Sequence, residues 1–211
     1  MDSISTSNKL DFNTFYELSD PLANRPLRLR LAPESQHITV EQESLLTKGR
    51  MTVDKPLKFE TFMGGQATDF LWSGHVTLVC ISPRVVELLR TCGCTGWSTY
   101  PVEVYDRKGE LLPGYLGFSI TGPECKRDKS RSQIIGKPIP GLPERSMKVY
   151  KGLYFNEECW DGSDFFWIRY LNAKIITEKV YRLFKKNKVR NIRMIPLPEA
   201  ERDVLLDRYE K

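Results

Sequence analysis

Four carboxylates fall within eight residues of the segment NEECWDGSDFF: Glu157, Glu158, Asp161 and Asp164. Such a cluster can bind a divalent cation or supply a general acid and a general base. Its spacing does not match the EF-hand calcium loop. The stretch 161–164 is also typical of a turn, in which aspartate side chains accept hydrogen bonds from nearby amides. The sequence therefore favours a turn, with an acidic patch facing a partner and a metal site as alternatives.

The thiols are the next candidates for chemistry. Cys80 and His75 are close in sequence, but Cys80 ends the apolar run VTLVCI at 76–81. This position predicts a buried structural cysteine rather than a Cys–His nucleophile. Cys92 and Cys94 form a C-x-C pair after a predicted helix, whereas redox pairs have C-x-x-C spacing at a helix start. Five cysteines, an odd number, and two histidines fit neither a disulfide framework nor a zinc site.

Two groups of side chains are candidates for binding a protein. Trp160 stands between carboxylates and a glycine turn, where an aromatic ring can anchor an interface, although a ring packed on its own turn is the alternative. A basic stretch at 126–131 is expected at the rim of the same interface. The predicted partner-binding residues are Trp160, Asp161, Asp164, Glu157, Glu158, Lys126, Arg127 and Arg131.

The net charge of +5 comes from the end of the chain. Residues 174–211 hold 11 Lys and Arg against 6 Asp and Glu, whereas residues 1–173 hold 21 of each. The run KKNKVRNIR at 185–193 is a candidate for contact with nucleic-acid phosphates. It lacks interleaved aromatic rings, and cations at a helix C-terminus also interact favourably with the helix dipole. A solvated helix end is therefore favoured, with nucleic-acid binding as an alternative.

Composition indicates a folded protein. The chain has 211 residues, 40% of them apolar and 28% charged, which excludes wholly disordered and collagen-like chains. No apolar run approaches the roughly 20 residues of a membrane span, and no signal peptide is visible at the N-terminus. We expect a cytoplasmic protein with one domain over 57–211. Residues 1–56 are expected to be an N-terminal extension packed on the core.

The middle of the chain contains the clearest elements. Ser82 is a good N-cap, Pro83 fits the first helical position and Gly93 fits the stop, so a helix is predicted between them. The alternating residues 97–105, a turn ending in Gly109 and the residues 115–121 predict a β-hairpin.

Fewer sequence features indicate the secondary structure of residues 122–209. Residues 122–148 carry four prolines and many charges, which indicates a long loop or flap, and residues 149–155 resemble a strand. Thr177 can cap a second helix, followed by a strand over 189–195. Residues 199–209 predict a short final helix that docks through three apolar residues, Val204, Leu205 and Leu206.

The chain also aligns with itself at an offset of 95 residues. Residues 69–102 match 164–197 without a gap, and seven of the 34 positions are identical. The identical pairs start at Asp69 and Asp164 and end at Pro101 and Pro196. The pattern predicts two strand–helix–strand halves, by duplication or by convergence on one pattern. The expected fold class is α+β, with a mixed or antiparallel sheet and two or three helices.

Several stretches resemble a family of bacterial immunity proteins. They are GWSTYPVEVYDRKGELLPGYLGFSITG (96–122), DKSRS (128–132), GLYFNEECWDGSDFF (152–166) and NIRMIPLPEAER (191–202). The resemblance is to immunity family eleven of polymorphic toxin systems, once a domain of unknown function, and covers about 69–202. It implies a small cytoplasmic α+β protein that binds a cognate toxin domain and blocks it. It implies no catalysis and no cofactor. From the residues themselves, no metal site is predicted.

Three functions therefore stand side by side. The first is steric neutralisation of a toxin domain through a protein interface, without a membrane. The second is a hydrolase-type enzyme, for which no residue indicates a substrate. The third is nucleic-acid binding through residues 185–193. The sequence favours the first.

Overall fold

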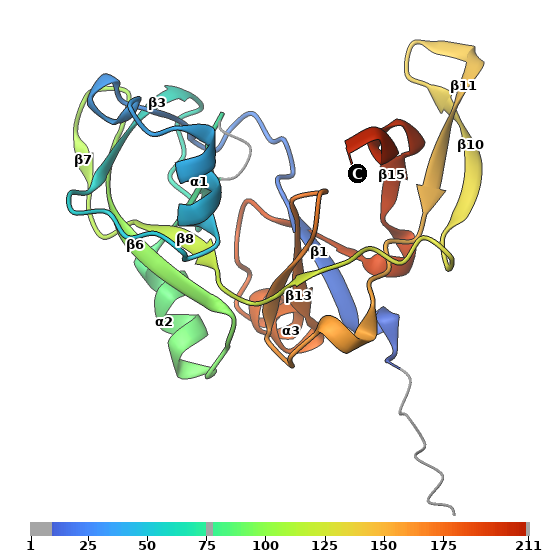
Figure 1. Ribbon diagram of the computed structural model, residues 1–211. Helices are drawn as coiled ribbons and strands as arrows, with labels where there is room; N and C mark the ends of the chain where they lie inside the picture. The colour runs from blue at the N-terminus through green and yellow to red at the C-terminus, as the bar shows by residue number, and fades with distance from the viewer. Residues whose placement is uncertain (1–9, 75–77, 210–211) are drawn as a thin grey trace, which may run out of the picture.

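The computed structural model describes residues 10–74 and 78–209. These residues form three β-sheets, three α-helices and five short 3-10 helices, so the chain has the predicted α+β fold. The two larger sheets and the three α-helices make up a body, with α2 (Pro83–Thr91) and α3 (Glu178–Lys186) packed into the apolar cluster that joins the sheets. One hairpin of the smallest sheet stands away from that body (Figure 1).

The first sheet has five strands in the order β14-β1-β13-β12-β9, antiparallel except for the pair β9 and β12. The strands are β14 (Arg193–Pro196), β1 (Phe15–Ser19), β13 (Ala173–Thr177), β12 (Phe165–Ile168) and β9 (Glu124–Cys125). Strand β1 is internal, and its residues Phe15, Tyr16 and Leu18 are buried. Contrary to expectation, residues 1–56 therefore do not simply lie over the core. Part of this segment builds the core, because β1 places apolar side chains on both faces of the sheet.

The second sheet runs in the order β2-β3-β6-β8-β5-β4, with β7 paired to β6. Its strands are β2 (Arg28–Leu31), β3 (Leu57–Met63), β6 (Trp97–Tyr105), β8 (Leu116–Ile120), β5 (Val79–Ile81), β4 (Phe70–Trp72) and β7 (Leu111–Leu112). The predicted hairpin over 97–121 is confirmed as β6 and β8. The start of the predicted strand 76–81 lies outside the described residues.

The third sheet holds the hairpin that stands out. Its order is β10-β11-β15, and all pairs are antiparallel. The strands are β10 (Gln133–Ile139), β11 (Leu142–Lys151) and β15 (Glu201–Asp203). The prediction of a long loop over 122–148 is wrong. The prolines fit a hairpin because Pro138 lies near the end of an edge strand, and Pro140 opens the turn that Gly141 completes with a φ of +82°.

The α-helices are α1 (Val40–Thr47), α2 (Pro83–Thr91) and α3 (Glu178–Lys186). Helix α2 begins as predicted: the Ser82 side chain accepts a hydrogen bond from the amide of Val85. With eight or nine residues each, these helices lack the length and apolarity that a membrane crossing requires.

The 3-10 helices are η1 (Phe12–Thr14), η2 (Pro33–Ser35), η3 (Glu157–Cys159), η4 (Leu197–Glu199) and η5 (Val204–Tyr209). The predicted final helix over 199–209 is wrong, because η4, β15 and η5 share this stretch. The expected docking patch is also wrong in part. Leu205 stays 57% exposed and Leu206 36% exposed, so these side chains do not pack into the core.

The two sequence repeats fold with the same strand registers. Phe70 pairs with Ile81 in the first half, and Phe165 pairs with Ile176 in the second. The helices α2 and α3 follow at equivalent positions. A further strand completes each half: β8 lies between β5 and β6, and β1 lies between β13 and β14. In the first half this strand, β8, follows the repeat in sequence. In the second half the strand, β1, precedes the repeat, so the alignment at an offset of 95 residues does not reveal it.

The two repeated aspartates connect the halves. Asp69 accepts hydrogen bonds from the Ser82 hydroxyl (3.2 Å), Arg84 (3.1 Å) and the backbone amide of Arg190 (2.8 Å). The last donor belongs to the other half. The second aspartate, Asp164, has the equivalent set: the hydroxyl of Thr177 (2.8 Å), the ammonium of Lys179 (2.9 Å) and the amide of Thr95 (2.9 Å). Each carboxylate therefore accepts hydrogen bonds from two side chains at the start of the helix in its own repeat. It also accepts one from a backbone amide in a loop of the other half.

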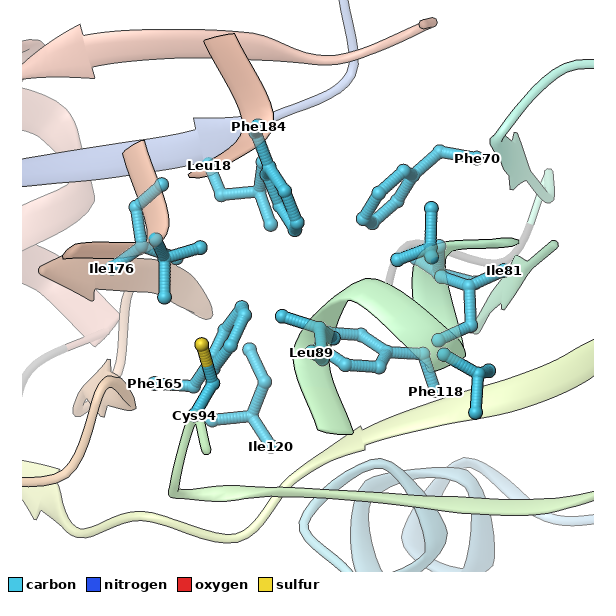
Figure 2. Close-up of a cluster of buried hydrophobic side chains, with 14 of the residues drawn as sticks. Leu18, Phe70, Ile81, Leu89, Cys94, Phe118, Ile120, Phe165, Ile176 and Phe184 are labelled. Atoms are coloured by element: carbon cyan, nitrogen blue, oxygen red, sulfur yellow. The ribbon is translucent and has the colours of Figure 1, made fainter. Parts of the chain in front are cut away.

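Both halves contribute to one apolar cluster (Figure 2). Phe165 and Phe184 come from the second half and meet Phe70 and Phe118 from the first. The ring centroids of Phe118 and Phe165 lie 5.4 Å apart, and those of Phe70 and Phe184 lie 5.8 Å apart. Contacts of this kind across the two sheets stabilise the body as one unit.

Candidate interaction surface

The predicted acidic patch is largely used inside the molecule. Asp164 is 6% exposed and belongs to the network between the halves, so its assignment as a partner-binding residue is wrong. Burial alone would raise the pKa of Asp164, but hydrogen bonds from Lys179, Thr95 and Thr177 outweigh burial and hold this pKa below its ordinary value. The carboxylate of Asp161 accepts a hydrogen bond from the amide of Ser163 at 2.9 Å, as the turn interpretation predicts.

Trp160 packs against the body. Its ring meets Phe15 edge-to-face at 5.0 Å, and its indole Nε1 donates to the Ser163 carbonyl at 2.9 Å. The alternative of a ring packed on its own turn therefore describes this side chain better than an interface anchor. Replacing Trp160 removes a core contact, so such a variant cannot separate binding from folding.

The basic stretch and the acidic loop do lie together. The amide of Asn156 donates to the carbonyl of Lys126 at 2.9 Å, and Arg131 pairs with Glu157 at 2.8 Å. The Arg131 guanidinium also lies 4.8 Å from the centre of the Phe12 ring. We call residues 126–132 and 154–161 the root.

A buried cation fixes the hairpin to the root. The guanidinium of Arg127 lies 4.5 Å from the centre of the Tyr150 ring in β11, and its side chain is 2% exposed. Tyr150 donates its hydroxyl to Asp207 at 2.8 Å, and Lys129 pairs with the same carboxylate at 2.8 Å. Hydrogen bonding to Asp207 raises the pKa of Tyr150. The root and η5 thus hold one face of the hairpin.

Only part of the predicted set faces outward. Lys126, Glu158 and Asp161 are exposed, whereas Glu157 and Arg131 pair with one another and Arg127 is buried. Several residues of the predicted set thus make contacts inside the molecule, and the partner-binding role of the exposed ones, Lys126, Glu158 and Asp161, stays a prediction.

The sequence analysis did not predict the hairpin of β10 and β11. We call β10 and β11, residues 133–151, the arm, and its residues 139–146 the tip. Ile134, near the base, is 58% exposed, and Leu142, at the tip, is 43% exposed. Between Pro138–Ser146 and Ile139–Leu142 the pairing shifts, so the residues 143–145 lie outside the ladder. The signal that could have revealed the arm is the turn pair Pro140-Gly141, with Ile134 and Ile135 before it and Met147 and Val149 after it.

A groove of about 600 Å³ runs between the arm and the edge strand β14. Lys137 lines it from the arm and Arg193 from β14. Lys137 forms an ion pair with Glu201 of β15, and Arg202 pairs with the buried Glu17 of β1. The arm is therefore tied to the body partway along β10, through Lys137.

The thiols show no arrangement for nucleophilic chemistry among the described residues. Cys80 is buried in β5, and burial raises the pKa of its thiol. His75 lies outside the described residues. Burial, with a smaller effect of Cys92, raises the pKa of Cys94 to about 12, so this thiol is protonated at neutral pH. Among the described residues, no three His, Cys, Asp or Glu side chains group as metal ligands.

The basic run at 185–193 has structural roles. It ends α3, and the amide of Arg190 and the side-chain amide of Asn191 donate to Asp69 and to the Phe70 carbonyl. Comparison of the chain with protein-family models and with curated proteins gave no match.

Proposed function

We propose that this chain is an immunity protein: it binds a toxin domain of a polymorphic toxin system and blocks it sterically. The observation that carries the proposal is the arm. A hairpin that leaves the body and exposes apolar and cationic side chains gains little by folding alone, since an isolated hairpin is marginal in water. We take the exposed Ile134 and Leu142, together with the exposed cations Arg145 and Lys148, as the side chains that a protein partner would cover.

The proposed interface combines the arm with the outward residues of the root, Lys126, Glu158 and Asp161. An interface of ordinary size buries about 800 Å² on each partner, and a few central residues dominate its energy. The arm, with strands of seven and ten residues, and the groove beside it would supply this surface. The proposed compartment is the cytoplasm, and the proposed activity requires no catalysis by this chain.

A rescue assay with a pull-down tests the proposal. The toxin domain encoded beside this chain is expressed in bacteria with and without it, and the tagged chain is purified from the survivors. We expect growth only when this chain is present and a 1:1 complex by size exclusion with light scattering. Phe165→Ala, which damages the core, is the control that should fail to protect. Toxicity that persists in the presence of the folded chain, with no complex, would reject the proposal.

A further inference from the structure

The arm is long enough to reach into a cleft of another protein. Its ladder pairs six residues of β10, 133–138, with residues 151–146 of β11. At about 3.4 Å per residue, the seven residues of β10 reach roughly 20 Å from the root. Towards the tip, Gly136, Lys137 and Pro138 are exposed, as are Pro140 and Gly141. Beyond the ion pair of Lys137 with Glu201, the residues 138 and 140–142 are thus open to solvent.

The free edge of β10 does not suit strand addition. Lys137 and Pro138 lie on this edge, and the ladder shifts immediately after Pro138. A lysine, a proline and a register shift are the devices that prevent another strand from pairing with an edge. A partner therefore meets the faces and the tip of the arm rather than extending its sheet.

The arm is held in place before any partner binds. Near its base, Tyr150 is fixed by Arg127 and Asp207, and further along β10 Lys137 is tied to Glu201. The turn at Pro140 adds a residue whose φ is already restricted. A preorganised element loses little conformational entropy on binding.

The net positive charge of the arm indicates that a partner surface would be acidic. Residues 133–151 hold four cations, Lys137, Arg145, Lys148 and Lys151, and one carboxylate, Glu144. Among the described residues, neither Arg145 nor Lys148 nor Lys151 has an ion pair. Burying such cations is costly unless the partner supplies carboxylates. The exposed Ile134 and Leu142 favour a protein over a nucleic acid, whose binding requires cations more than aliphatic side chains.

We infer that the tip enters a cleft of the toxin domain whose walls carry carboxylates, so that the arm is the inhibitory element. This inference rests on the proposed function. The groove beside the arm would then receive one lip of that cleft, between β10 and β14.

The first experiment reverses the charge of the arm. Arg145→Glu with Lys148→Glu is compared with Arg107→Glu with Lys108→Glu, an equal charge change in an exposed turn of the body. Affinity for the toxin domain, refolded from the co-purified complex, is measured by calorimetry at 50 and 300 mM salt. We expect at least about a 30-fold loss for the arm variant and a weaker salt dependence, and less than about a threefold change for the control.

The second experiment maps the contact. A carbodiimide joins lysines directly to carboxylates, and mass spectrometry identifies the linked residues. We expect Lys148 linked to an Asp or Glu of the toxin domain. Lys148→Arg should retain the affinity and lose this link.

The outcomes separate the two proposals. If the wild type binds the toxin domain and both charge reversals bind equally well, the proposed function stands and the inserted arm is rejected. If the wild type forms no complex, both are rejected. If only the arm variant loses salt-dependent binding to a 20-residue oligothymidylate, while toxin affinity is unchanged, the arm binds nucleic acid and the inference is wrong.

Discussion

The two halves of the body and the arm use their polar side chains in opposite ways. Asp69 and Asp164 each bind their own repeat and the loop of the other half, and both are buried. Arg145 and Lys148 in the arm have no ion pair among the described residues. A carboxylate is therefore a weak candidate for a functional residue when the equivalent residue of the other repeat makes the same internal contacts. The better candidates are the side chains that the fold does not use.

The largest expected effect concerns the core that both halves share. Phe165→Ala removes a fully buried ring and should lower the free energy of unfolding by about 3–5 kcal/mol. Ile134→Ala, in the arm, should change it by less than about 0.5 kcal/mol. Urea unfolding followed by tryptophan fluorescence measures both. Similar losses for the two variants would show that the arm belongs to the cooperative core, against the contrast drawn above.

The second effect tests a position at which the halves differ. Lys174 is 7% exposed, where its repeat partner is Val79, and its ammonium lies 5.2 Å from the Trp167 ring and 5.7 Å from the Trp72 ring. Burial lowers the pKa of Lys174 to about 8 from an ordinary 10.5. Lys174→Met should therefore stabilise the protein by about 1–3 kcal/mol at pH 7.

The pH dependence of that variant gives a sharper test. Between pH 8 and 10.5 the unfolded chain holds the Lys174 proton while the folded chain has released it, so wild-type stability gains from this residue as pH rises. The advantage of Lys174→Met should shrink across that window, at up to about 1.4 kcal/mol per pH unit. Urea unfolding of both proteins at pH 7, 8, 9 and 10 measures the difference. A constant difference would mean that Lys174 titrates as in the unfolded chain.

The sequence predicted local features well where one segment contains all the partners. Ser82 and Pro83 define the start of α2, and the residues 97–121 define a hairpin, because caps and turns depend on neighbours in sequence. The place of β1 could not be predicted, since Tyr16 pairs with Ile176 and Pro196, far away in the chain. The repeat could be found from spacing, but the strands that complete its halves could not.

The candidate site was predicted only by region. Carboxylates and a tryptophan on a loop indicated an interface, yet Asp164 and Trp160 make contacts with residues that are distant in sequence, namely Thr95 and Phe15. Prolines concealed the arm because in sequence they suggest a loop, whereas on an edge strand the missing amide costs no ladder bond.

A third effect, similar in size to that of Lys174→Met, compares the equivalent turns of the two halves. Gly96 and Asn191 both have positive φ, +78° and +64°. A Cβ at Gly96 would lie 2.2 Å from the Phe165 carbonyl oxygen, whereas Asn191 reaches the Phe70 carbonyl with its side-chain amide at 2.7 Å. Asn191→Gly should cost about 1 kcal/mol through the lost hydrogen bond. Gly96→Asn should cost more, about 2–3 kcal/mol, because it forces the two backbones apart. Equal losses of stability for the two variants in thermal unfolding would mean that both turns tolerate a side chain equally well.

The smallest effect is expected where the arm is changed without a partner. Arg145→Glu with Lys148→Glu removes no ion pair among the described residues, and both side chains are exposed. The free energy of unfolding should therefore stay within about 0.5 kcal/mol of the wild type, and the circular dichroism spectrum should not change. Arg127→Met is the matched contrast, since it removes the buried cation that contacts Tyr150 and should loosen the arm. Hydrogen exchange of β10 and β11 measures that loosening. Faster exchange in the charge-reversal variant as well would mean that these cations stabilise the hairpin, and any loss of binding could then no longer be attributed to a missing contact with the partner.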